Sequence, residues 1–447
     1  GHIASLLPGD VIARYYRKTG ANVLYVSGTD SHGTPITIRA QEEHCDPIDI
    51  ANYYHNEFCY CFDKLNFSYD NYTSTCSEYH KKFVKTCIQQ IYNNDYLYEK
   101  DGHLYWKLSS FQDDIEKFVI SHEGEWRFNA INESEKYLQE GLHDRAITRQ
   151  LDWGIDVPVK GFEDKKIYVW IEAVLGYISS GKDYCTQHHL DWNEFYKNPN
   201  TKSYFVHGKD NIPFHTIIYP ALLLSLNDEY HLPDFIVSSE YLNTNDEKIS
   251  KSEGNGVTAK ELIGKYSSDT IRYYMISNAP EQRDANFSYD ILIQLHNKKL
   301  VGEYGNFINR NLAFLVKKFD RVIPDGFVDE SIKNHIEITY KVVGSLIEKG
   351  KLKSAIAKIQ DLVQFANKYY DDNKPWISVK ENIYDFYIVT FTCLELIINI
   401  ANLYEPFIPE SSKKVFSFFG KTSCSWEYIS IEPLSLLEDV SILFDRI

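Results

Sequence analysis

Long apolar runs, paired cysteines and an excess of basic residues are all missing from this chain. No apolar run has the length expected of a membrane-crossing helix, so no membrane span is predicted. A formal charge of −16 argues against a protein that coats nucleic acid non-specifically. Local basic contacts remain compatible with it, because most of the negative charge falls before residue 301. The eight cysteines contain no CxxC pair, and free thiols suit a reducing compartment.

Metal-ligand spacing is weak in this sequence. His55 and Cys59 are four residues apart, as are Cys76 and His80, and Cys61 follows Cys59 at i+2. Such pairs could hold a metal on a helix, but core cysteines and surface histidines are the commoner explanation. We therefore predict no metal site.

Methionine is nearly absent as well: Met275 is the only one, and the chain begins at Gly1-His2. We expect that the natural beginning was lost or trimmed, so the sequence carries no information on a targeting peptide. A length of 447 residues, with 43% hydrophobic and 25% charged residues, is typical of a globular protein of two or three domains.

Strands and helices alternate in the first part of the chain, and strands nearly disappear in the last part. Helices are predicted over 3–19 and 214–226, and strands over 22–28, 167–170, 203–206 and 234–238. This alternation is typical of a parallel α/β sheet, which binds ligands at the carboxyl ends of its strands. Helical periodicity over 307–319, 332–348, 352–370 and 383–404 predicts a helix bundle.

The segment Glu247–Asn255 contains two lysines three residues apart, with serines and a glycine, before a helical region. Taken alone, it is most simply a solvated loop. The alternative is a mobile loop whose ammonium groups close on a polyphosphate and stabilise charge in the transition state.

Two short sequences resemble, in the correct order, the signatures of class I aminoacyl-tRNA synthetases. Gly1-His2 resembles the second half of H-[IL]-G-H, and Lys248–Ser252 (KISKS) resembles the KMSKS loop with Ile for Met. Longer blocks resemble the methionyl-tRNA synthetase branch: Gly28–Ile36 (GTDSHGTPI), Thr148–Ile155, Val169–Ala173 (VWIEA) and Gly208–His215. The resemblance extends from residue 1 to about residue 440.

The resemblance implies a Rossmann-type parallel-sheet catalytic domain with a small insertion, followed by an all-α anticodon-binding helix bundle. The expected segments are the first half of the catalytic domain, a reduced connective insertion, the second half, the KMSKS loop with its linking segment, and the helical domain, over 1–97, 98–159, 160–247, 248–299 and 300–447 respectively.

The amino-acid site is expected around Asp30, whose carboxylate at a strand end can pair with the substrate ammonium. A turn aspartate that satisfies local amides is the structural alternative. The family implies further contacts from Val169, Trp170, Ala173, Tyr177, Asn211, His215 and Tyr219, although aromatic stripes of this kind are usually core. The family often has Pro at Val174, Ile at Asn211 and Trp at Tyr219, so the shape of this pocket departs from the common pattern.

The family also implies an ATP site. His2, Lys248 and Lys251 would act on the phosphates as catalytic residues, and Gly208, Lys209 and Asp210 would help to bind ATP, with Asp210 paired to Arg149. The methionine carboxylate would attack the α-phosphorus and release pyrophosphate, and the terminal ribose of tRNA would then take the aminoacyl group. Mg²⁺ is expected on the pyrophosphate moiety, and no side-chain nucleophile is needed.

In the helical region, Asn306, Arg310 and Trp376 match the family's anticodon readers, where a Trp stacks on a base and polar side chains bond base edges. A solvated Arg310 and a Trp376 that caps the bundle are the structural alternatives. The expected partners are tRNA(Met), L-methionine and ATP, and the core is expected to be a cytoplasmic monomer, an organellar location not being excluded.

The family often carries a zinc knuckle in the insertion. Here Tyr98–Gly102 passes almost directly into 103–112, which resembles the segment after the knuckle, so we predict no zinc. The residues before Gly1 are expected to form a central strand that brings the first signature histidine, and the natural gene product is expected to contain them.

Two other functions remain open at this point. One is a class I synthetase for another apolar amino acid, such as leucine, isoleucine or valine, but these usually carry a large editing domain, and 98–159 is too short for one. The other is a degenerate paralogue that binds tRNA without activating an amino acid, although it would be expected to lose His2 or Lys251.

Overall fold

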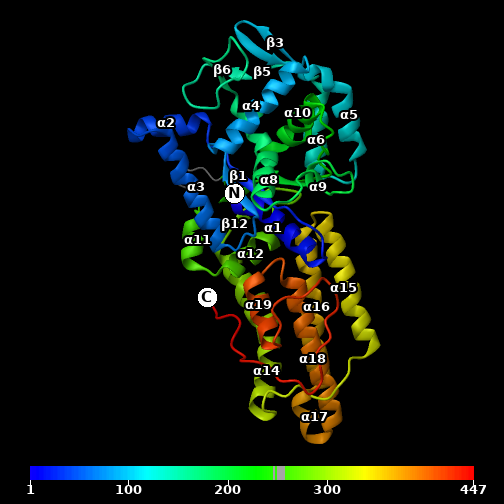
Figure 1. Ribbon diagram of the computed structural model, residues 1–447. Helices are drawn as coiled ribbons and strands as arrows, with labels where there is room; N and C mark the ends of the chain where they lie inside the picture. Colours follow the sequence, from blue (N-terminus) through cyan, green and yellow to red (C-terminus); the bar gives the residue numbers. More distant parts are fainter. Residues whose placement is uncertain (245–246, 249–256) are drawn as a thin grey trace. The chain divides into compact units, whose positions relative to one another are not determined.

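The computed structural model describes residues 1–244, 247–248 and 257–447, with only the backbone at 247 and 248 (Figure 1). Contacts divide the chain into two units. The first, which we call the sheet unit, comprises residues 24–63 and 67–240. The second, the helical unit, comprises residues 1–23, 64–66 and 241–447.

Two pairs of parallel strands form the centre of the sheet unit. Strand β1 (Val26–Thr29) pairs with β2 (Asn71–Ser74), and β8 (Tyr204–Gly208) pairs with β9 (Phe235–Ser239). A side chain at Gly28 would meet the carbonyl oxygen of Thr73 at 2.8 Å, so only glycine permits this close pairing. Helix α8 (Gly176–Gln187) lies against β1 (Figure 1).

Helices and short strands surround these pairs. Buried apolar side chains, among them Val84, Ile88 and Trp106, join them into one core. The remaining elements of the unit are α2 (Thr34–Glu43), α3 (Pro47–Lys64), α4 (Glu78–Asn93), β3 (Leu97–Lys100), β4 (His103–Trp106), η1 (Leu108–Phe111), α5 (Gln112–Ser121), α6 (Phe128–Gln139), β5 (Arg145–Ala146), β6 (Thr148–Arg149), β7 (Lys166–Ile167), α7 (Val169–Glu172), η2 (Ala173–Leu175), α9 (Asn193–Tyr196), η3 (Lys209–Asn211), the π-helical turn η4 (Phe214–Ile218) and α10 (Tyr219–Leu226).

The predicted strand at 167–170 is partly wrong. Strand β7 ends at Ile167, and Val169 already belongs to helix α7. Apolar β-branched and aromatic residues in a run of four cannot be assigned to strand or helix by periodicity alone. The hairpin of β3 and β4 lies where the zinc knuckle was expected to be deleted, and helices α5 and α6 follow it.

Long helices form most of the helical unit, in which α16 packs against both α15 and α18 (Figure 1). Their bounds lie within three residues of the predicted helical segments. The unit contains α1 (His2–Lys18), β10 (Leu242–Thr244), β11 (Glu247–Lys248), α11 (Ala259–Lys265), α12 (Ser268–Ser277), β12 (Ala285–Phe287), α13 (Tyr289–Leu295), the π-helical η5 (His296–Gly305), α14 (Asn306–Lys318), α15 (Glu330–Glu348), α16 (Leu352–Asn373), α17 (Pro375–Glu381), α18 (Ile383–Tyr404) and α19 (Pro409–Phe418).

Helix α18 corrects the statement that no apolar run is long enough to cross a membrane. By length and composition it passes that test. However, 89% of its most apolar stretch is buried inside the protein. Its apolar residues therefore form the core of the helical unit, where a helix that is apolar all round is expected.

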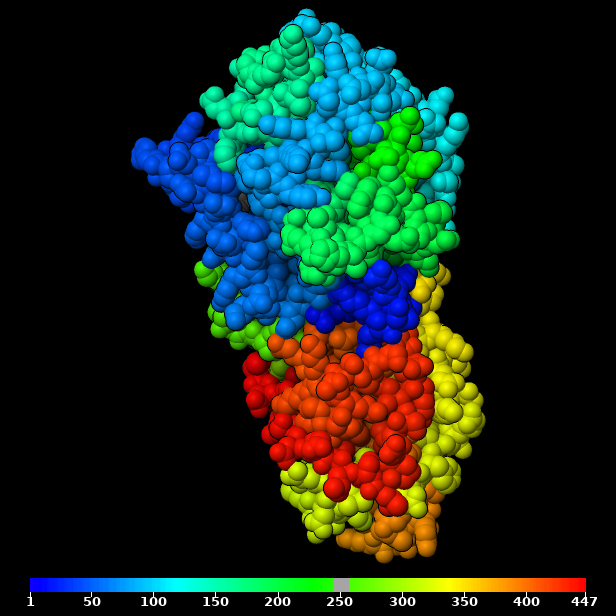
Figure 2. All heavy atoms as spheres, in the orientation of Figure 1, coloured from blue at the N-terminus to red at the C-terminus, as the bar shows by residue number. Residues whose placement is uncertain are grey.

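The segment after α19 lies along the surface of the helical unit (Figure 2). The amide of Glu438 donates to the carbonyl of Phe418, and the Lys414 ammonium donates to the carbonyl of Ile442. The side-chain amide of Asn399 in α18 donates to the Ile429 carbonyl, and its oxygen accepts from the Ile429 backbone amide. These bonds fix an extended segment that has little regular structure of its own.

Candidate amino-acid and tRNA sites

The polar turn that carries Asp30 follows the carboxyl end of β1. Because β2 runs parallel to β1, the turn after β2 lies beside it. Three contacts join the two turns: the Ser31 amide donates to the Thr75 hydroxyl at 3.0 Å, the Thr75 amide donates to the Thr29 carbonyl at 3.1 Å, and the hydroxyls of Ser31 and Ser74 lie 3.0 Å apart. The predicted ammonium acceptor is thus held by both strands.

Behind this turn, one buried carboxylate contacts two histidines. Oε1 of Glu172 lies 2.8 Å from Nδ1 of His32, and Oε2 lies 2.7 Å from Nε2 of His80. Burial opposes ionisation of Glu172, but the hydrogen bonds from the two imidazoles outweigh it and hold its pKa below the ordinary value. Burial lowers the pKa of His32, but hydrogen bonds with Cys76 and Glu172 outweigh this and raise the pKa to about 9. The cluster therefore contains an imidazolium and a carboxylate at neutral pH.

Asp30 is solvent-exposed as a whole, but its surroundings change the pKa of its carboxyl group. Loss of hydration and repulsion from Glu172 raise the pKa of Asp30 to about 6. Its carboxylate in turn helps to raise the pKa of Tyr177, so the two side chains interact electrostatically. A carboxylate that is ionised at pH 7 but poorly compensated is a good acceptor for a substrate ammonium group.

Tyr177 and His215 form a neutral hydrogen-bonded pair. Nδ1 of His215 lies 2.8 Å from the carbonyl of Asn211, and a carbonyl only accepts, so Nδ1 carries the proton. Nε2 then accepts from the Tyr177 hydroxyl at 2.8 Å. Burial lowers the pKa of His215 to about 4 and raises that of Tyr177 to about 12. Neither group carries charge at neutral pH.

Aromatic rings surround this pair. The rings of Trp170 and Phe214 are stacked, with centroids 4.3 Å apart, and Tyr219 packs edge-on to Tyr177. Trp170 remains 37% exposed, whereas Tyr219 is buried. Val169 and Ala173 are partly buried on the helical segments α7 and η2, which continue into α8. The structure thus brings together the predicted aromatic residues, Asn211 and Asp30 in one region of the sheet unit.

Lys209, which follows β8, and Arg149 each have contacts that were not predicted. Lys209 forms an ion pair with Glu240, with 2.6 Å between Nζ and Oε2. The Arg149 guanidinium donates to the carbonyls of Ala146 and Thr148 and lies over the ring of Tyr168. The pairing of Arg149 with Asp210, and a role for Gly208, Lys209 and Asp210 in binding ATP, stay predictions.

The predicted phosphate-binding residues lie in the helical unit. His2 is the first residue of α1, and Lys248 pairs through its backbone with Asn243 of β10. Lys251 lies outside the described residues. A common site for these residues and the aromatic cluster stays a prediction.

In the helical unit, Tyr370 joins two of the three predicted anticodon residues. The Arg310 guanidinium lies 4.3 Å from the Tyr370 ring centroid and donates to Asp371 and Asn367, each at 2.9 Å. The Trp376 ring lies 5.4 Å from the same tyrosine and is 44% exposed. Asn306, one turn before Arg310 on α14, is exposed. The arrangement presents an aromatic face and polar groups at the surface.

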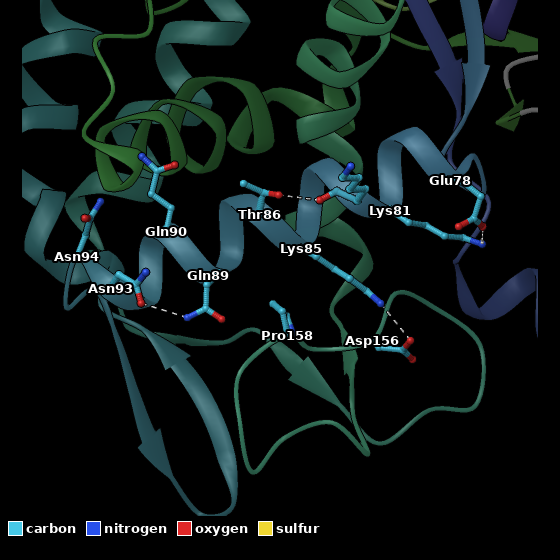
Figure 3. Close-up of a pocket in the computed structure, with 11 residues that line it drawn as sticks. Glu78, Lys81, Lys85, Thr86, Gln89, Gln90, Asn93, Asn94, Asp156 and Pro158 are labelled. Atoms are coloured by element: carbon cyan, nitrogen blue, oxygen red, sulfur yellow. Dashed lines mark hydrogen bonds and ion pairs between the residues drawn. The ribbon is translucent and has the colours of Figure 1, made fainter.

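A surface hollow of about 930 Å³ lies along α4, and none of the predicted site residues lines it (Figure 3). Its polar lining includes two ion pairs, Lys85 with Asp156 and Lys81 with Glu78. The stacked aromatic rings and the buried histidine–carboxylate cluster lie around Asp30 and not in this hollow.

The buried cluster around Glu172 was missed in the sequence. His80 and His32 lie 92 and 140 residues before Glu172 in the chain. Of the three residues, only His32 and Glu172 lie in blocks that resemble the family. The expectation that His80 is a surface histidine is wrong, because its side chain is 2% exposed and Glu172 holds it. Among the residues that the structure describes, no three His, Cys, Asp or Glu side chains are grouped so as to hold a metal.

Comparisons with known proteins show the family to which the chain belongs. The model of the family "tRNA synthetases class I (M)" matches residues 1–102 and 98–312, and that of the "anticodon binding domain of methionyl tRNA ligase" matches residues 325–441. Methionine–tRNA ligase 1 of Alkaliphilus oremlandii is 40% identical over 100% of this chain and 94% of its own. The ligase of Streptococcus pneumoniae is 41% identical over 100% of this chain and 93% of its own.

A similar fold is found in the methionyl-tRNA synthetase of Mycobacterium tuberculosis, whose crystal structure contains methionyl-adenylate. Its TM-score to this chain is 0.89, at 22% identity, over 100% of this chain and 96% of that one. The likeness confirms the predicted fold class, a Rossmann-like catalytic domain followed by a helical anticodon-binding domain.

The family model, together with the paired parallel strands and the helical domain, shows that the chain is a class I aminoacyl-tRNA synthetase. Within that class, the chain belongs to the methionyl-tRNA synthetase family. The predicted family and the predicted enzyme, a methionine–tRNA ligase, are confirmed.

Proposed function

We propose that this enzyme binds methionine between Asp30 and the Tyr177–His215 pair, and joins it to tRNA(Met) at the expense of ATP. The observation that carries the site is the adjacency of an ionised carboxylate and a neutral, aromatic-walled hydrogen-bonded pair. The carboxylate accepts the α-ammonium group. The rings contact a thioether, whose polarisable sulfur packs well against aromatic edges.

The neutral pair also accounts for selectivity. The Tyr177 hydroxyl donates to Nε2 of His215, and the Nδ1–H of His215 donates to the Asn211 carbonyl. No charge is left to stabilise an acidic or basic substrate side chain, and desolvation excludes both. A flexible, unbranched thioether fits between the rings without leaving a buried polar group unpaired.

The chemistry is alignment and charge stabilisation. The methionine carboxylate attacks the α-phosphorus of ATP, pyrophosphate leaves, and the 3′-terminal ribose hydroxyl of tRNA then attacks the carbonyl of the adenylate and releases AMP. We assign phosphate contacts to His2, Lys248 and Lys251, with Gly208, Lys209 and Asp210 as further ATP contacts. Mg²⁺ would be held by the ATP phosphates and would stabilise their charge.

Methionine-dependent ATP–pyrophosphate exchange tests the substrate. We expect stimulation by methionine and not by leucine, isoleucine or valine. Tyr177→Phe removes one hydrogen bond and should raise the KM for methionine about tenfold. Tyr184→Phe is the matched control, because Tyr184 stacks on His188 along the same helix, outside the aromatic cluster. Stimulation by leucine, or an equal effect of both variants, would contradict the proposal.

We also propose that Trp376 stacks on an anticodon base, with Arg310 and Asn306 beside it. The partly exposed ring beside the Arg310–Tyr370 pair supports this. Trp376→Ala should reduce tRNA charging about ten- to a hundredfold and leave exchange unchanged, because stacking on one base contributes about 1–3 kcal/mol. Ile338→Ala, at a 55% exposed apolar residue of α15, should change neither. Equal loss of charging and exchange in Trp376→Ala would refute the assignment.

A further inference from the structure

Two cysteines of the sheet unit face an imidazole at the same distance. Sγ of Cys76 lies 3.6 Å from Nε2 of His32, and Sγ of Cys59 lies 3.6 Å from Nε2 of His55. The two pairs differ in what holds the other ring nitrogen. His32 contacts the buried carboxylate of Glu172, whereas His55 contacts the neutral hydroxyl of Thr29 at 2.9 Å.

This difference decides the charge beside each sulfur. Hydrogen bonds with Cys76 and with Glu172 raise the pKa of His32 to about 9, so the ring is protonated at neutral pH and its Nε2–H lies toward Cys76. Burial lowers the pKa of His55 and raises that of the Cys59 thiol, so this second pair stays neutral. A thiol that faces an imidazolium, itself oriented by a carboxylate, has the arrangement that activates cysteine nucleophiles.

The surroundings of Cys76 leave it open to a reagent. Cys76 is partly exposed and stands just before Ser77, the N-cap of the sixteen-residue helix α4. The helix N-terminus adds positive potential. The charged and titratable neighbours of His32 and Glu172 are His80 and Asp30, and the ring of Trp153 packs edge-on to His32.

We propose that Cys76 is a modification site, a nucleophilic thiol that forms a reversible mixed disulfide with low-molecular-weight disulfides and thereby closes the amino-acid site. The Cys76 thiolate attacks one sulfur of the disulfide, a new S–S bond forms, the original S–S bond breaks, and one small thiolate leaves. A reducing thiol reverses the exchange. The closing of the site rests on the proposed methionine site, whereas the reactivity of the thiol does not.

Modification of Cys76 would disturb the methionine site because the turn that carries Cys76 is hydrogen-bonded to the turn that carries Asp30. Cys76 lies on the turn after β2, which is bonded to the Asp30 turn through Ser31, Ser74 and Thr75. A bulky group on the sulfur removes the contact with His32, whose backbone amide approaches the Asp30 carboxylate at 3.4 Å. Displacement of either turn misplaces the ammonium acceptor, so binding of methionine weakens.

Selective modification is the first test. The full chain is treated with glutathione disulfide, and the modified cysteines are mapped by peptide mass spectrometry over time. We expect Cys76 to react at least about tenfold faster than Cys59. Glu172→Gln, which removes the acceptor of the His32 proton, should slow Cys76 about fivefold and leave Cys59 unchanged. Equal rates for the two thiols, or an unchanged Cys76 rate in Glu172→Gln, would overturn the proposal.

The second test links modification to activity. Methionine-dependent exchange should fall at least about fivefold with a rise in the KM for methionine, and recover with dithiothreitol. Cys76→Ser and Cys76→Ala, checked by thermal melting, should resist the treatment, while Cys59→Ser should stay sensitive. If glutathione disulfide inhibited both Cys76 variants as strongly as the wild type, the proposed role of Cys76 would be refuted. Because labelling needs no activity, an unmodified enzyme that activates no methionine would reject the proposed function and leave the reactivity of Cys76 testable.

Discussion

In each unit a buried carboxylate is held by two basic side chains, and the kind of base differs between the two units. In the sheet unit, Glu172 is held by two histidines. In the helical unit, Asp10 lies 2.8 Å from the Arg14 guanidinium and 2.6 Å from that of Arg272, and the side chains of Asp10 and Arg272 are fully buried. Arg272 also donates to the carbonyls of Leu65, Pro406 and Phe407.

Because of this difference, the charge of the Asp10 cluster is constant with pH, whereas the charge of the Glu172 cluster changes with pH. An arginine stays protonated and presents five donors, so the Asp10 cluster fixes the start of the chain to α12 and to the turn after α18 at any ordinary pH. A histidine can release its proton, so the Glu172 cluster adjusts its charge to its surroundings. The adjustable cluster is the one beside the proposed methionine acceptor, where its charge acts on Asp30.

Breaking the arginine cluster should have the largest effect on stability. Arg272→Leu leaves the Asp10 carboxylate buried with one fewer cation and removes donors from three carbonyls, so we expect a loss of about 3–5 kcal/mol of unfolding free energy. Urea denaturation measures it. Arg321→Leu, which removes an exposed ion pair with Asp439, is the control and should cost less than about 1 kcal/mol. Equal losses would show that Arg272 is no more than a surface charge.

Breaking the histidine cluster should have a smaller effect. In Glu172→Gln the His32 imidazole can lose its charge instead of remaining as a buried cation, so we expect a loss of about 1–3 kcal/mol. Glu78→Gln, at a carboxylate that is 90% exposed, should be nearly neutral. A loss in Glu172→Gln as large as that in Arg272→Leu would remove the distinction between the two clusters.

The pH dependence of these losses sharpens the comparison further. His32 has a raised pKa of about 9, so its contribution is complete below about pH 6.5 and is lost as the pH rises through 9. The pKa of Glu172 is lowered, so its contribution is present above its ordinary pKa and is lost at acid pH. The stability difference between the wild type and Glu172→Gln should therefore shrink by roughly 1–2 kcal/mol between pH 6.5 and 9.5.

The corresponding difference for Arg272→Leu should stay constant over the same range, because neither arginine titrates there. Urea denaturation of the three proteins at several pH values gives both curves. Parallel curves for the two variants would contradict the account of the histidine cluster.

The same contrast explains how much could be predicted from the sequence. The long helices of the helical unit were predicted within three residues, and α18 at its observed bounds, because helical periodicity is a local pattern. The family blocks led to Asp30, Trp170 and His215, and Tyr177 was found on the same helical face as Trp170; the structure brings these residues into one region. The Val169–Trp170 segment was misassigned, because four apolar residues suit a strand and a helix equally well.

The buried clusters could not be predicted in this way. Glu172 meets His32 and His80, and Asp10 meets Arg272, only after the chain has folded, and nothing in local spacing joins residues 92 to 262 positions apart. The Tyr370 ring between Arg310 and Trp376 is a third case, because it depends on how α14 packs near α16.

Calorimetric titration of methionine into the enzyme at several pH values tests the central claim most directly, namely that Asp30 is the acceptor of the substrate ammonium. With a pKa of about 6 for Asp30, affinity should be constant above about pH 7 and fall about tenfold for each pH unit below 6. Asp30→Asn should bind about a hundredfold more weakly, without this pH dependence. Binding by Asp30→Asn that equals the wild type in strength and pH profile would contradict it.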